Sequence, residues 1–201
     1  MDNIIGNINS YTDQKGNILL KSNNGIFCSS FYFQDYYDDR QIVKFVKSTE
    51  SIIRQSKEYN DYLALIKTNY NILNFDNVQS HISESDADIE IHHYPFTLFE
   101  IVDIVMTKHI AKKDKFTSFS LAKEIMNLHF AHKVGFVPLS KTNHELAHDN
   151  GLFLSTKQVF GNWKEFYEEY KEYISEEIKE KIRHIESLSD SGMASDFRGI
   201  Y

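Results

Sequence analysis

The pattern of apolar and polar positions predicts an α+β chain. In the first third, the short apolar runs IIGNI, NILL and GIFCSSFYF are separated by Asn, Gly and Asp, which predicts β-hairpins. From about Asp38 to Ile72 the apolar residues recur at helical spacing, so one long helix or two short ones should follow. The polar stretch from 74 to 88 predicts turns and a soft boundary.

The middle of the chain alternates predicted strands and helices. IEIHH has the alternation of a strand, and VGFVPLS predicts a second strand that we expect to end at Pro138. Between them, Thr97 and Glu100 form a capping box that begins a helix reaching about residue 110, and a second helix is expected over about 118–130. The two helices would form an insertion over about 97–132.

The end of the chain predicts one long amphipathic helix. From about Asn162 to Leu188 the apolar residues fall on one side, and the polar tail DSGMASDFRGIY follows. This helix is a candidate surface for a homodimer or for a protein partner. We therefore expect three segments: an N-terminal β-hairpin and helix module (1–75), a core (76–160), and the C-terminal helix with its tail (161–201).

Composition narrows the classes of protein that fit. The chain has 201 residues, enough for one core with an added module, and it lacks an apolar run long enough to cross a membrane. No secretory signal pattern is visible, so we expect the cytoplasm, or the host cytoplasm if a phage encodes the chain. The single cysteine, Cys28, cannot form an internal disulfide or a cysteine-rich zinc site. Any metal ion must be held by His, Asp, Glu or Asn.

Net charge argues against indiscriminate nucleic-acid binding. The formal charge is -7, whereas phosphate neutralisation by Lys and Arg supplies most non-specific affinity. One basic stretch, KHIAKKDK, is a candidate for substrate binding through Lys108, Lys112, Lys113 and Lys115. A solvated loop between helices explains the same stretch equally simply.

The segment TNHELAHDNG contains the H-E-x-x-H pattern of zinc metalloproteases, with His144 and His148 as the helical ligands. Thr142 and Glu145 also have the spacing of a helix capping box, which gives the glutamate a structural role instead of a catalytic one. The extended protease pattern needs a histidine six residues after the second, and Leu154 stands there. A protease is therefore the weaker interpretation.

A better partner for this motif is the pair His92-His93 in IHHYP. A strand ending in His-His, a return strand and a short helix bearing H-x-x-x-H resemble the HNH, or ββα-metal, nucleases, especially the variant of nuclease colicins and pyocins. The resemblance implies that His92, His144 and His148 hold one divalent metal ion and that His93 is the general base. Helical residues four apart share a face, and neighbouring strand residues point oppositely, so only one histidine of the pair can join the helical two.

The resemblance implies a metal-dependent endonuclease acting on DNA or RNA, DNA being the first expectation, with a ββα-metal core interrupted by the helical insertion. The ion could be Zn, Mn, Ni, Co or Mg, although three imidazoles suit Mg least. The family's asparagine that orients the base is missing near Val134 and Gly135. The alternative is a catalytically weakened HNH-fold scaffold, or a protein-binding component of a phage or mobile element.

Overall fold

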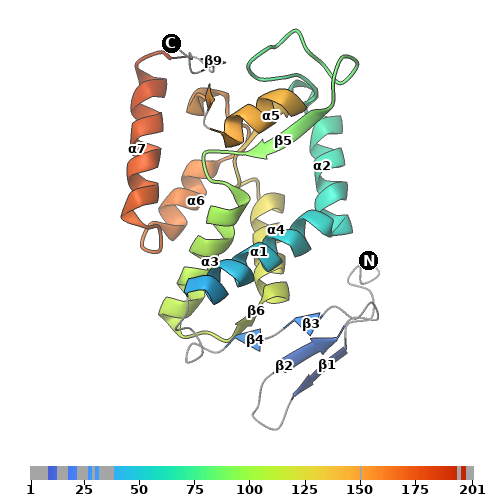
Figure 1. Ribbon diagram of the computed structural model, residues 1–201, viewed down its shortest axis with the longest axis vertical. Helices are drawn as coiled ribbons and strands as arrows, with labels where there is room; N and C mark the ends of the chain where they lie inside the picture. The colour runs from blue at the N-terminus through green and yellow to red at the C-terminus, as the bar shows by residue number, and fades with distance from the viewer. Residues whose placement is uncertain are drawn as a thin grey trace. The chain divides into compact units, whose positions relative to one another are not determined.

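The computed structural model has a helix-rich α+β fold (Figure 1), and it describes residues 9–12, 18–21, 27–28, 30–31, 39–149, 151–193 and 196–197. Side-chain surroundings are described from 40 to 149 and from 151 to 193, so the Cys28 side chain and most of the polar tail lie outside them. The chain forms two compact units. The first contains Met1–Asp61 and Leu98–Leu128, and the second contains Tyr62–Thr97 and His129–Tyr201. The three segments expected from the sequence stay predictions.

Short antiparallel strands open the first unit, as the hairpin pattern predicted. One sheet has the order β1-β2-β3, and a second sheet pairs β4 with β6. Their bounds are as follows: β1 (Asn9–Thr12), β2 (Ile18–Lys21), β3 (Phe27–Cys28), β4 (Ser30–Phe31) and β6 (Phe116–Thr117).

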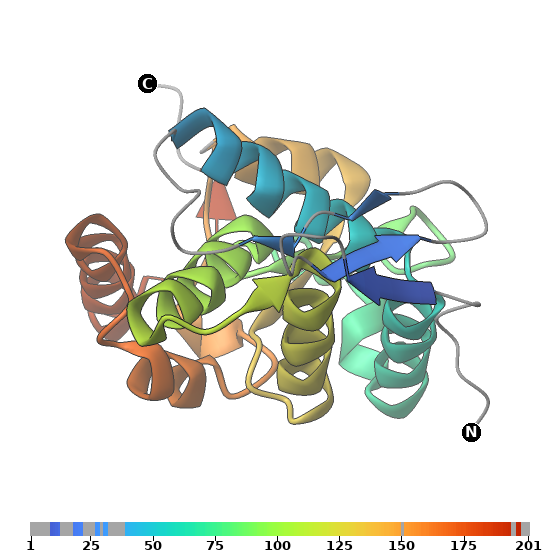
Figure 2. The ribbon, with the colours of Figure 1, turned by 90° about the horizontal axis from the view of Figure 1, so that it is seen from below.

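The described part of the first unit also contains helices; α2 begins there, and α4 ends just beyond it. They are α1 (Asp39–Gln55), α2 (Lys57–Asn69), α3 (Leu98–Lys112) and α4 (Ser118–Phe130). The stretch that predicted one or two helices holds two, because Ser56 interrupts it and its hydroxyl accepts a hydrogen bond from the Tyr59 amide at 3.1 Å. Both helices predicted for the insertion are confirmed. Figures 1 and 2 show α3 and α4 side by side with α1 across them.

The second unit is built on a two-stranded antiparallel sheet. Strand β5 (Ile89–His93) pairs with β7 (Phe136–Ser140), and both strands were predicted. The expectation that Pro138 ends its strand is wrong, since it pairs with Ile91 in mid-strand. Its carbonyl accepts a hydrogen bond from the Asn77 amide at 2.8 Å, away from β5. The N and C=O of a strand residue point the same way, so the missing N–H of Pro138 leaves the β5–β7 ladder intact.

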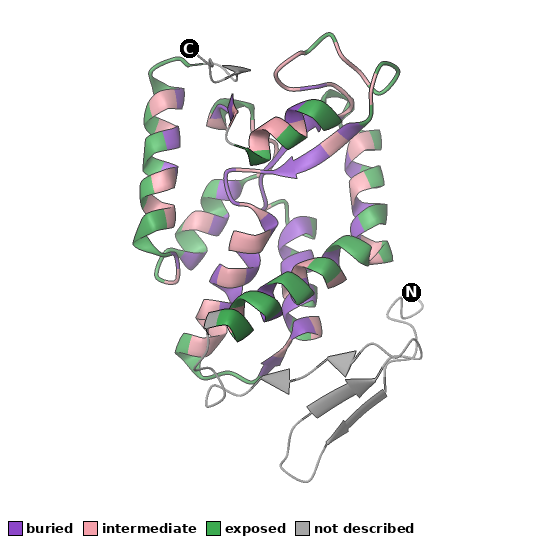
Figure 3. Ribbon diagram, in the orientation of Figure 1, coloured by how far each residue is buried: buried purple, intermediate pink, exposed green. Residues whose placement is uncertain are grey.

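Helix α5 (Lys141–His148) follows β7 without a loop and lies along the sheet (Figure 1). Its N-cap is Ser140, which is still paired with Ile89 of β5. The helix therefore begins before Thr142, and the predicted cap formed by Thr142 and Glu145 is wrong. In Figure 3 most of β5 has the colour of buried residues, and every residue of β7 is buried. One buried apolar cluster lies between the sheet and α5: it contains Val137 and Leu139 of β7 with Leu152 and Leu154, and Leu146 and Ala147 of α5 pack against it.

Two helices stand where one long C-terminal helix was predicted. Helix α6 (Trp163–Tyr170) ends before α7 (Glu176–Asp190) begins. The break occurs because Ser175 caps α7, its hydroxyl accepting a hydrogen bond from the Ile178 amide at 3.3 Å. The second unit also contains η2 (Asn71–Asn74), η3 (Thr156–Gln158), and β8 (Leu152–Phe153) paired with β9 (Asp196–Phe197). Within the described ranges, no helix has the length and apolarity needed to cross a bilayer.

Candidate metal centre

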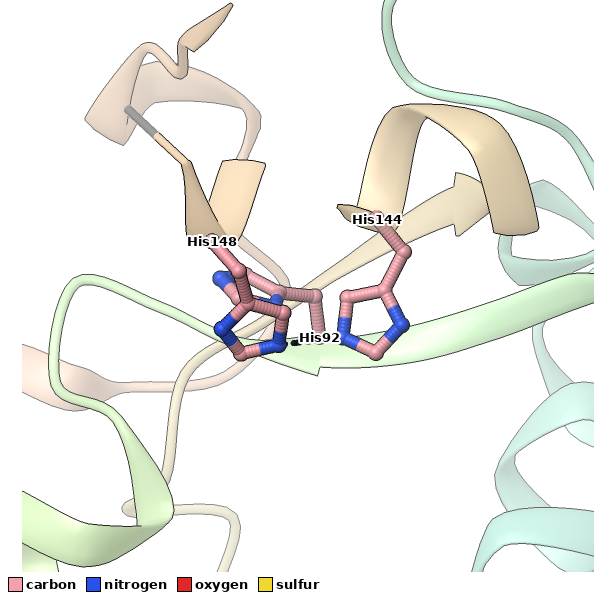
Figure 4. A group of neighbouring side chains, drawn as sticks. All are labelled: His92, His144 and His148. Carbon is pink, nitrogen blue, oxygen red and sulfur yellow. Dashed lines mark hydrogen bonds between the residues drawn. The ribbon is translucent and has the colours of Figure 1, made fainter. Parts of the chain in front are cut away.

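Three histidines of the second unit converge on one point (Figure 4). His92 comes from β5, while His144 and His148 come from successive turns of α5. One ring nitrogen of each lies within 4.8 Å of the others, and the Nε2 atoms of His144 and His148 are 3.1 Å apart. A tetrahedral zinc ion with bonds of about 2.0–2.1 Å separates its ligand nitrogens by about 3.3 Å. The nitrogens of His144 and His148 are already close to this separation, and the whole set would have to draw together by up to about 1.5 Å to hold such an ion.

Local structure explains why these side chains meet. Alternate strand residues share a face, so Glu90 and His92 both point from β5 toward α5. Helical residues four apart also share a face, so His144 and His148 return toward β5. Exposure increases across the group: His92 is 7% exposed, the His144 side chain is 20% exposed, and His148 is exposed. A metal ion there would be reached from the solvent on the His148 side.

The group offers nitrogen ligands and leaves one position open. Among the described residues, these three histidines are the one group of three or more His, Cys, Asp or Glu side chains whose ligand atoms lie close enough to hold a metal ion. Three ligands leave the fourth position of a tetrahedral ion to water or to another molecule. Neutral imidazoles suit Zn, Ni, Co or Mn better than Mg, which prefers oxygen. The donor set thus fits a first-row transition metal.

Glu90 supports the group from behind, a contact that the sequence analysis missed. Its Oε2 atom accepts a hydrogen bond from Nδ1 of His144. Metal-binding histidines commonly donate their second ring N–H to a carboxylate in this way. The available signal was the two-residue spacing of Glu90 and His92, which places both on the same face of a strand.

His93 does not join the three histidines. Its side chain is 3% exposed and its Nε2 lies 3.0 Å from Nε2 of His129, which is fully buried at the end of α4. The ring of Phe136 packs against both imidazoles, at centroid distances of 4.9 and 5.7 Å. No asparagine stands near Val134 or Gly135, and a histidine contacts the predicted base instead. His93 therefore faces the protein core rather than the metal centre.

A buried carboxylate, also missed in the sequence analysis, holds the start of α5. Asp76 is 1% exposed, and its Oδ1 accepts hydrogen bonds from the amides of Val78 and Gln79 at 2.8 and 2.7 Å. Its Oδ2 accepts from the Ser140 amide at 2.5 Å and from Nδ2 of Asn143 at 2.9 Å. Burial raises the pKa of Asp76, but these hydrogen bonds outweigh it and hold the pKa below its usual range. An aspartate that accepts from amides two and three residues later is a known turn signal.

The basic stretch lies in the first unit, whereas the three histidines lie in the second. Lys108 forms an ion pair with Glu124, whose second oxygen also bonds Nε2 of His109 at 2.7 Å. The other three lysines of the stretch are exposed: Lys112, Lys113 and Lys115. Part of the positive charge is therefore neutralised within the unit, and substrate binding by these lysines stays a prediction.

Comparison with known proteins identifies the family but supplies no relative of known activity. The family model of bacteriophage G278-like virion proteins matches residues 1–197. Searches among curated proteins and among solved structures found no match. The match supports the expectation of a phage protein and is silent on nuclease chemistry. Because it covers nearly the whole sequence, the chain belongs to the bacteriophage G278-like virion protein family.

Proposed function

We propose that this chain is a structural component of the virion whose β5–β7–α5 region is a scaffold cross-linked by one transition-metal ion, zinc being the best fit. The ligands would be His92, His144 and His148. One observation carries the proposal: three imidazoles from β5 and α5 converge, while His93 is buried on the opposite face against His129. This arrangement suits holding an ion better than activating water.

An ion at this place would reinforce a weak point of the fold. Helix α5 has eight residues, and helices shorter than about 12 residues are marginal by themselves. An ion bound to two residues of α5 and one of β5 would fix the helix against the sheet. Binding at a ligand concentration of about 100 times Kd adds about 2.7 kcal/mol to the free energy of unfolding.

Metal content and thermal unfolding test this proposal. The purified chain should bind one zinc ion, and zinc should raise Tm by roughly 5–10 °C relative to chelator-treated protein, as expected for a protein of this size. His144→Ala should abolish both effects. His184→Ala, which replaces an exposed histidine on α7, is the matched control and should keep them. Absence of a bound ion, or zinc binding by His144→Ala equal to that of the unchanged chain, would refute the scaffold.

A metal-dependent endonuclease is the second candidate, and the open fourth position beside the exposed His148 favours it. Plasmid nicking should be measured with Zn, Mn, Ni, Co or Mg and with chelator. We expect no nicking, because His93 has its Nε2 engaged by buried His129. Metal-dependent nicking that disappears in His92→Ala and in His93→Ala would establish the nuclease instead. Casein cleavage lost in Glu145→Ala would indicate the weaker protease interpretation.

A further inference from the structure

We propose that Glu90 is a positioning residue of the metal centre, and that it selects the form of His144 whose Nε2 is free to bind the ion. The inference rests on the proposed function of the three histidines as metal ligands. Glu90 lies outside that ligand set and acts on it through its hydrogen bond to His144.

Strand register and hydrogen bonding place Glu90 for this task. It is paired with Leu139 of β7, so its backbone is held in the sheet two residues before His92. From there its Oε2 bonds Nδ1 of His144, whose Nε2 lies 3.1 Å from Nε2 of His148. The two nitrogens of the His144 ring are thus directed at different groups, Nδ1 at the carboxylate and Nε2 at the other imidazole.

The chemistry of a carboxylate makes this contact selective. An ionised carboxylate only accepts hydrogen bonds, so the proton of neutral His144 must reside on Nδ1. Nε2 then keeps its lone pair, which accepts a hydrogen bond from His148 in the metal-free chain and can bind an ion when one is present. The same arrangement fixes the plane of the ring.

Hydrogen bonding, rather than net charge, should dominate the effect of Glu90. Its side chain is 43% exposed, and solvent screens the attraction between an exposed carboxylate and a nearby cation. The amide of glutamine can still accept from Nδ1 through its oxygen although it carries no charge. Glu90→Gln should therefore retain much of the function, whereas Glu90→Ala should lose it.

The first test reads the tautomer of His144 by ¹H–¹⁵N NMR in the metal-free protein. The unchanged chain and Glu90→Gln should carry the proton on Nδ1, and Glu90→Ala should shift it toward Nε2. Glu145→Ala is the matched control, because it removes an exposed glutamate next to His144 and should leave the tautomer unchanged. An Nδ1–H tautomer that persists in Glu90→Ala would overturn the inference.

The second test measures zinc affinity by competition with a chromophoric chelator. Glu90→Ala should bind zinc about 10–100 times more weakly than the unchanged chain, and Glu90→Gln should recover most of the loss. Equal affinity in Glu90→Ala and the unchanged chain would overturn the inference while leaving the scaffold proposal intact. If the unchanged chain bound no zinc, the scaffold proposal would fail, and the tautomer measurement would still decide the role of Glu90.

Discussion

Replacing Asp76 with asparagine tests whether this buried carboxylate holds helix α5 in place. The substitution keeps the shape of the side chain but exchanges one acceptor oxygen for an NH2 group. The remaining oxygen can still accept two hydrogen bonds, from Val78 and Gln79 or from Ser140 and Asn143. In either orientation of the new amide, its NH2 group faces two of the four N–H donors that Asp76 accepts from, so those two donors lose their acceptor.

The expected loss follows from that count. A buried donor without an acceptor costs about 1–3 kcal/mol. Asn143 also donates to Oε1 of Gln79 at 3.3 Å, so it keeps one partner. The combined cost of the two lost hydrogen bonds should therefore lie toward the lower end of its range. We therefore expect Asp76→Asn to lower the free energy of unfolding by about 2–3 kcal/mol at neutral pH, a large share of the roughly 5–15 kcal/mol of an ordinary protein.

The contribution of Asp76 to stability also depends on pH. The pKa of Asp76 in the folded chain is lowered, so its contribution to stability is complete above the pKa of the unfolded chain. That unfolded pKa is about 3.9. The contribution is lost as the pH falls through the lower pKa of the folded chain. The difference in stability between the unchanged chain and Asp76→Asn should therefore shrink below about pH 4.

Urea unfolding followed by circular dichroism measures both effects. Asp86→Asn is the control, since Asp86 is an exposed aspartate of the same loop that accepts a hydrogen bond from the Ser83 amide. It should change stability far less than Asp76→Asn. A loss below about 1 kcal/mol for Asp76→Asn at neutral pH, or a difference that persists unchanged in acid, would refute the account of this network.

Other predictions concern single features of the fold. Ser175→Ala should lower the free energy of unfolding by about 1 kcal/mol in urea, because the cap on the Ile178 amide is lost, and an unchanged midpoint would contradict this. Gly135→Ala should cost about 1–3 kcal/mol in the same assay, since the added Cβ would lie 2.1 Å from the Tyr94 carbonyl oxygen. Burial raises the pKa of Tyr59 to about 12, so absorbance titration should find its phenol ionising late, and its contribution to stability should be lost as the pH rises from about 10 toward that value.

Local patterns were sufficient to predict several elements of the fold. Helices α3 and α4 and the strands β5 and β7 occur where apolar spacing placed them, because each pattern lies within one element. The prediction of a single C-terminal helix was wrong. Apolar periodicity continues across Ser175, but the capping of α7 by this serine ends the continuity of the helix. Pro138 was misjudged because its effect depends on which side of the strand its nitrogen faces, and that follows from the register in which β7 pairs with β5.

The candidate site shows a similar limit. Spacing alone indicated that His144 and His148 share a face and that one of the paired histidines joins them. The orientation of the pair was available in the alternation of IEIHH, since Ile89, Ile91 and His93 share the apolar face that packs on the core. The contact of His93 with His129 lay beyond local reasoning, because it joins side chains from distant elements of the second unit.

The division of the chain into two discontinuous units has a consequence for how the candidate site assembles. The chain passes from one unit to the other at 61/62, 97/98 and 128/129. Strands β5 and β7 both belong to the second unit, whereas the segment 98–128 between them, with α3 and most of α4, belongs to the first. Closing such a loop costs little extra stability as its length grows, but pairing of distant segments slows folding. The three histidines consequently cannot be excised as one short peptide, and a minimal metal-binding fragment would have to replace residues 98–128 with a linker.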